Sequence, residues 1–186
     1  MTKYYMLECY GPDDVERAGI AQVEGLDDVN WMLGRALTDS IPSPIRITLD
    51  ADDGVMLPMF NSEILLFSDA LIGVLERAGV DNLDLYECVL SNPVTGTTFT
   101  DYKAVNIIGL VAAADMGKSK YQAPTGLVTD VDFDSLVIDQ ARVGDLLLFR
   151  LAECVSGIVV HESVKRAVDA SGIPYLDWVD PREWVG

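Results

Sequence analysis

The sequence predicts an α+β fold in which two related strand–helix–strand halves pack as one mixed-sheet domain. Residues 158–179 align without a gap onto residues 65–86, and nearly every apolar position in one copy meets an apolar position in the other. The chain has 186 residues, of which 49% are hydrophobic. That length suits one domain over residues 1–186 and buries a core without disulfides or structural metals.

The first copy reads as strand, helix and strand. The triplet Leu65–Phe67 is short, apolar and β-prone. Ser68 followed by Asp69 predicts a helix start, because serine caps helix N-termini and the helix dipole favours an acid in the first turn. An apolar stripe at helical spacing follows, formed by Leu71, Val74, Leu75 and Ala78. Gly79 then ends the helix. The second strand is marked by Val80, Leu83, Leu85 and Val89.

The second copy repeats this order with a more polar helix. Ile158–Val160 predicts the strand, and His161 takes the helix-start position that Ser68 has in the first copy. The helix ends at Gly172, and Leu176 and Trp178 mark the strand behind it.

Shorter elements are expected elsewhere along the chain. Apolar, β-prone runs predict strands at Tyr4–Cys9, Ile45–Leu49, Tyr102–Leu110 and Asp145–Leu151. Residues 27–36 are expected to form a short helix that carries Trp31. The loop at residues 91–96 lies at the midpoint of the chain and is expected to separate the two halves.

The charge of the chain is strongly acidic. Thirty acids against thirteen bases give a net charge of −17. Such a field repels nucleic-acid phosphates and anionic membranes, and it attracts a basic protein partner, chiefly by raising the association rate. The alternative interpretation is that the acidity serves solubility.

The cysteines and the N-terminus predict a cytoplasmic protein. Cys9, Cys88 and Cys154 are odd in number, far apart and outside any Cys-x-x-Cys pair, so they predict neither a disulfide framework nor a zinc site. The N-terminus has no apolar run of signal-peptide type, and the longest apolar stretch, residues 105–114, is too short to span a bilayer.

No residue pattern predicts a cofactor, a metal or a catalytic centre. The segment Gly117–Ser119 resembles the end of a phosphate-binding loop, but Ala112 replaces the glycine that such a loop needs. Asp130, Asp132 and Asp134 alternate as in a calcium loop, but Ser135 and Ala141 occupy the positions of its glycine and its closing glutamate. His161 is the only histidine; a capping or surface role is favoured over that of a general base.

The candidate partner-binding residues are one aromatic side chain and two acidic loops. Trp178 is expected in the core, whereas Trp31 and Trp184 are candidates for exposed aromatics, which often anchor partners. Acidic loops are what a basic partner meets first. The predicted partner-binding residues are Trp31, Asp50, Asp52, Asp53, Asp130, Asp132 and Asp134.

Several segments occur in an order that is typical of one family, namely Phe67–Leu71, Leu75–Val80, Tyr102–Ile108, Asp115–Tyr121, Leu148–Leu151 and Ile158–Val164. In these segments the chain resembles family eleven of the immunity proteins of bacterial polymorphic-toxin systems, a group typified by a myxobacterial protein. The resemblance covers residues 60–180. The chain departs from the family at His161, where serine is usual, and in its acidic first sixty residues.

The resemblance implies a small cytoplasmic protein that binds and neutralises a cognate toxin without catalysis. It implies no catalytic residues, and it gives Asp115 and Ser119 a structural role in a turn. Two other hypotheses stay open: a small hydrolase that uses His161, and a self-associating regulatory or structural module.

Overall fold

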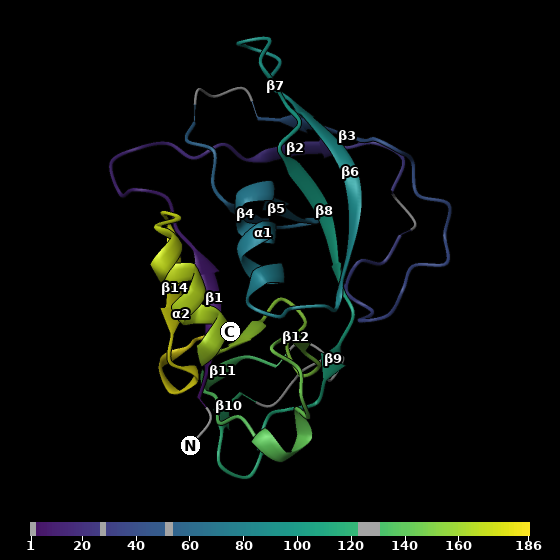
Figure 1. Ribbon diagram of the computed structural model, residues 1–186. Helices are drawn as coiled ribbons and strands as arrows, with labels where there is room; N and C mark the ends of the chain where they lie inside the picture. The colour runs from purple at the N-terminus through teal and green to yellow at the C-terminus, as the bar shows by residue number, and fades with distance from the viewer. Residues whose placement is uncertain (1–2, 27–28, 51–53, 123–130) are drawn as a thin grey trace.

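Two mixed sheets, one above the other, form the framework of the molecule (Figure 1). The computed structural model describes residues 3–26, 29–50, 54–122 and 131–186. Within them, the β1 sheet has the order β14-β1-β13-β12-β9, and the β6 sheet has the order β2-β3-β6-β8-β5-β4 with β7 beside β6. The predicted α+β class is confirmed.

The strands of the β1 sheet are β1 (Tyr4–Cys9), β9 (Leu110–Val111), β12 (Leu148–Leu151), β13 (Ile158–His161) and β14 (Leu176–Val179). Those of the β6 sheet are β2 (Ile20–Val23), β3 (Ile45–Leu49), β4 (Met59–Asn61), β5 (Leu65–Ser68), β6 (Leu83–Ser91), β7 (Thr98–Phe99) and β8 (Tyr102–Ile107). A hairpin pairs β10 (Lys120–Tyr121) with β11 (Phe133–Ser135). The helices are α1 (Asp69–Arg77), α2 (Glu162–Ser171) and the 3-10 turns η1 (Gln140–Arg142) and η2 (Pro181–Glu183).

Each predicted repeat forms strand, helix and strand around an antiparallel third strand. In the β6 sheet, α1 connects β5 to β6, and β8 lies between these two strands and antiparallel to both. In the β1 sheet, α2 connects β13 to β14, and β1 lies between them in the same way. The N-terminal strand therefore belongs to the sheet that the second copy builds.

The two helices begin with side-chain caps at equivalent positions. The Ser68 hydroxyl accepts a hydrogen bond from the Leu71 backbone N–H at 3.3 Å. His161 Nδ1 accepts one from the Ser163 N–H at 3.1 Å, and it lies 2.7 Å from the Ser163 hydroxyl. The predicted helix starts and the capping role of His161 are confirmed, as is the left-handed glycine after α1, Gly79, with φ +93°.

Because His161 caps α2, its replacement is expected to cost helix stability. Alanine at position 161 removes the cap and should destabilise the fold by about 1 kcal/mol. Serine restores the cap and should recover most of that loss, although it forgoes the edge contact of the His161 ring with Tyr4. Urea unfolding of the two variants measures the difference; equal losses would contradict the capping role.

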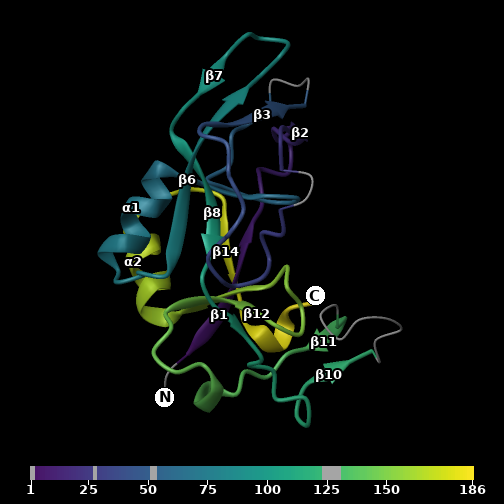
Figure 2. The ribbon, with the colours of Figure 1, turned by 90° about the vertical axis from the view of Figure 1, so that its right-hand side faces the viewer.

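One central core holds both helices and both sheets together. It joins Leu71 and Leu75 of α1 and Val164 and Val168 of α2 to strands of each sheet, and all four side chains are buried. Figure 2 shows both helices on the same side of the sheets, while the long irregular segments lie on the opposite side. Those segments cover a second core behind the β6 sheet and a third behind the β1 sheet.

Two expectations about the chain path are wrong. Residues 29–36 form turns and not a helix, because Gly34 takes a left-handed conformation with φ +64° and its carbonyl accepts a hydrogen bond from the Gly109 N–H. Residues 91–96 do not separate two halves, because they form the turn between β6 and β7 within one sheet. The predicted strands at 102–110 and 145–151 also shorten to β8 and β12.

Candidate partner-binding surface

Exposed apolar side chains and carboxylates lie together where β1 ends and β14 begins. The Tyr10 N–H donates to the Tyr175 carbonyl at 3.0 Å, which extends the β1–β14 pairing by one step. Tyr10, Val15 and Tyr175 are 53%, 46% and 36% exposed. Together with Glu8, Asp13, Asp14 and Asp177 they form what we call the Tyr10–Tyr175 surface.

Acids dominate the electrostatics of this surface. Glu8 and Asp177 are direct partners across the β1–β14 pair, so their side chains lie on the same face, an unfavourable arrangement for like charges. Burial and then the carboxylates of Glu8 and Asp177 raise the pKa of Tyr10. Among the described residues no cation pairs with Asp13, Asp14 or Asp177.

Trp31, predicted to be an exposed anchor for a partner, is buried. Its side chain is only 4% exposed, belongs to the core behind the β6 sheet, and meets the Tyr86 ring edge-on at 5.4 Å. Trp184 is also buried, and its indole N–H donates to Glu8 at 2.8 Å. Trp178, expected in the core, is half-buried and packs against the edge of the central core.

The first predicted acidic loop contributes one described residue, Asp50. Its carboxylate accepts a hydrogen bond from the Gly19 N–H at 2.8 Å, and its own N–H donates to the Gly19 carbonyl. Asp50 thus ties the chain before β2 to the end of β3. Asp52 and Asp53 lie outside the described residues.

The second predicted acidic loop is described from residue 131 onward. Asp132 and Asp134 are exposed, and the intervening Phe133 is buried, so the acids project outward from β11. Asp130 lies outside the described residues. In both views β11 lies at the opposite end of the molecule from β3, so Asp50 does not share a surface with Asp132 and Asp134 (Figures 1 and 2).

Two of the three cysteine thiols are poor candidates for a nucleophile. Burial raises the pKa of Cys9 to about 11 and that of Cys88 to about 12, so both thiols stay protonated at neutral pH. His161 Nδ1 is engaged at the start of α2.

Among the described residues no group of three or more His, Cys, Asp or Glu side chains could hold a metal ion, and no helix is long and apolar enough to cross a membrane.

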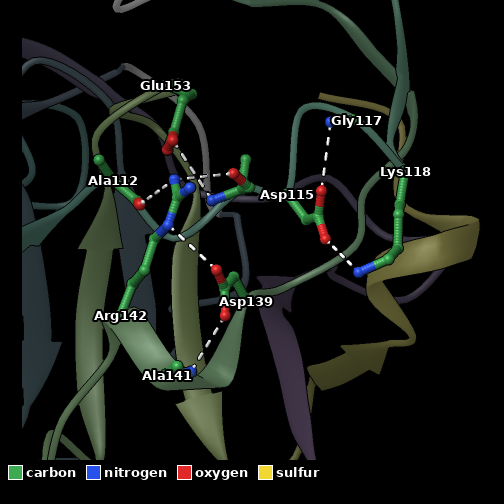
Figure 3. A network of polar contacts seen from close by, with 9 residues as sticks. Ala112, Asp115, Gly117, Lys118, Asp139, Ala141, Arg142 and Glu153 are labelled. Carbon is green, nitrogen blue, oxygen red and sulfur yellow. Dashed lines mark hydrogen bonds and ion pairs between the residues drawn. The ribbon is translucent and has the colours of Figure 1, made fainter.

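A polar network fixes the segment between β9 and η1 (Figure 3). Asp115 accepts from the Gly117 N–H at 3.2 Å, which is the expected role in a turn; Ser119 instead accepts from the N–H of the distant Val137 at 2.9 Å. The Arg142 guanidinium bonds the Ala112 and Ala114 carbonyls and the Asp139 carboxylate. The network therefore serves the fold of this segment.

Glu153 is a buried member of this network whose carboxylate is only partly hydrogen-bonded. Its side chain is 8% exposed; Oε1 accepts from the Ala114 N–H at 3.3 Å, and Oε2 has no hydrogen-bond partner among the described residues. Burial raises the pKa of Glu153, and the nearby Arg142 opposes this only in part.

Replacing Glu153 by glutamine is therefore expected to raise stability at neutral pH. Because the folded-state pKa is raised, ionisation of this carboxyl disfavours the fold, and the wild-type chain loses stability as pH rises through that pKa. The neutral amide does not undergo this loss, so the stabilities of the variant and the wild type should become equal below about pH 4. Thermal unfolding across pH measures the gap, with the exposed Glu63→Gln as control; a gap independent of pH would contradict the assignment.

No protein-family model matches this chain, and no curated protein matches it.

The Tyr10–Tyr175 surface was missed by sequence reasoning because its two halves are 165 positions apart and meet only through strand pairing. One local signal was available: the run Tyr10 to Glu16 places an aromatic residue, a proline turn and three acids together.

Proposed function

We propose that this protein is an immunity protein of family eleven, which binds a cognate bacterial toxin in the cytoplasm and neutralises it by contact alone. The observation that carries the proposal is the Tyr10–Tyr175 surface, where exposed apolar side chains lie among acids that form no ion pair with a described cation, within a chain of net charge −17. Such a surface suits a partner with basic residues, as the active site of a nuclease has.

The proposal includes a common origin for the two strand–helix–strand units. Ser68 and His161 cap α1 and α2 at positions that the sequence alignment equates. Each unit also places one antiparallel strand between its own two strands. These shared features support related halves within one domain.

The local chemistry supports binding over hydrolysis. The only histidine is a helix cap, and the two thiols with raised pKa values are poor nucleophiles. A binder requires neither.

Growth rescue tests the proposed function. The product of the neighbouring gene is expressed in a bacterial host with and without this protein. We expect growth to stop in its absence and to continue in its presence, and the two proteins to purify together. A toxic neighbour whose effect is unchanged, with no complex recovered, would contradict the proposal.

A further inference from the structure

The tyrosines of the Tyr10–Tyr175 surface lack the cations that other aromatic rings of this chain have. Lys3 Nζ lies 4.7 Å and Lys165 Nζ 5.5 Å from the Tyr5 ring centre, and Lys165 also lies 5.7 Å from that of Trp178. No described cation lies over Tyr10 or Tyr175. Their exposed faces are therefore open to a cation from outside.

Four carboxylates lie near Tyr10, two on the β1–β14 pair and two in the turn that follows β1. Glu8 and Asp177 are partners on the β1–β14 pair, and Glu8 also accepts a hydrogen bond from the Trp184 indole N–H. Asp13 and Asp14 occupy the corners of the turn that the Val15 N–H closes on the Pro12 carbonyl at 3.3 Å, and both are exposed. An open hollow of about 710 Å³ is lined by residues 10–17, with Arg17 as the base among them.

We propose that the Tyr10–Tyr175 surface receives an arginine-rich segment of the protein partner, with guanidinium groups stacked on the tyrosines and paired with the carboxylates. This rests on the proposed function, in which the partner is a toxin with a basic surface. The surface combines exposed aromatic rings with carboxylates, whose charge is opposite to that of arginine. A cation placed there also reduces the repulsion between Glu8 and Asp177.

Arginine fits this surface better than lysine. A guanidinium is planar, stacks on aromatic faces and bonds a carboxylate through two N–H groups at once. A lysine ammonium is a strongly hydrated point charge, so it gains less from a ring beside carboxylates. The surface should therefore prefer arginine to lysine at equal charge.

Calorimetric titration of the full-length protein with hexa-arginine and hexa-lysine tests this preference. We expect hexa-arginine to bind about threefold more tightly, the gain of one exposed cation–π contact. Tyr10→Ser and Tyr175→Asn should remove the difference. Asparagine suits position 175 because Tyr175 has φ +67°, a conformation that asparagine tolerates.

Two double variants of equal charge locate the binding face. Asp13→Asn with Asp14→Asn should weaken hexa-arginine binding about fivefold, the loss of two exposed ion pairs. Asp132→Asn with Asp134→Asn removes the same charge at β11 and should change binding less than about twofold, because neither acid lines the hollow that Tyr10 shares with Asp13 and Asp14. Equal losses in both double variants, or an arginine preference that survives both tyrosine substitutions, would overturn the proposal. Thermal unfolding confirms that each variant folds.

The two proposals can fail separately. If the Tyr10→Ser, Asp13→Asn and Asp14→Asn variants rescue growth as well as wild type, the toxin binds elsewhere and only the surface assignment fails. If the surface prefers hexa-arginine as expected but no toxin is neutralised, the proposed function fails and the arginine site stands.

Discussion

Replacing Leu71 by alanine is expected to lower the free energy of unfolding by about 3 kcal/mol, because it opens a cavity in the central core. Leu71 is fully buried at the start of α1, in the cluster that joins both helices to both sheets. The loss should appear in a single cooperative transition, since neither sheet keeps a complete core without the other.

Urea unfolding followed by tryptophan fluorescence and far-ultraviolet circular dichroism measures this effect. Trp31 and Trp184 lie in the two outer cores, so fluorescence follows both sides of the molecule. Leu85→Ala on β6 is the matched control, because Leu85 is 38% exposed and its loss should cost less than about 1 kcal/mol. Two separate transitions, one for each sheet, would contradict the single-domain packing.

Raising the salt concentration from about 50 to 500 mM is expected to slow association with the proposed toxin partner at least about tenfold. The acids of the Tyr10–Tyr175 surface attract a basic partner at a distance, and salt screens that attraction. The dissociation rate should change much less, because the contacts within the complex are short. Surface plasmon resonance at several salt concentrations separates the two rates.

The expected salt dependence arises because the proposed partner is positively charged and the Tyr10–Tyr175 surface is negatively charged. The Asp13→Asn, Asp14→Asn variant should associate more slowly than wild type at low salt and equally fast at high salt. An association rate that does not vary with salt would show that the acidity of this surface takes no part in capture.

Local signals in the sequence were enough to predict the repeated units. Ser68 and Gly79 bracket α1 because capping and the left-handed conformation depend on neighbouring residues only. The helix expected at residues 27–36 failed for the opposite reason: Gly34 contacts Gly109, far along the chain, and that contact sets the local backbone.

The candidate site was less predictable than the fold. Trp31 is buried because the chain before β3 folds over the second face of the β6 sheet, and no local pattern shows this. Tyr10 and Tyr175 meet because β1 pairs with β14, a pairing that joins the two ends of the chain. Sequence patterns predicted a partner-binding surface lined by acids, but strand pairing determines which acids lie together.

The most direct test of contact-based neutralisation is a titration of toxin activity at fixed toxin concentration, well above the dissociation constant. We expect residual activity to fall in a straight line and to reach zero at one equivalent of this protein. Complete loss of toxin activity at a small fraction of an equivalent would contradict the binding mechanism, because only turnover can inactivate many toxin molecules with one.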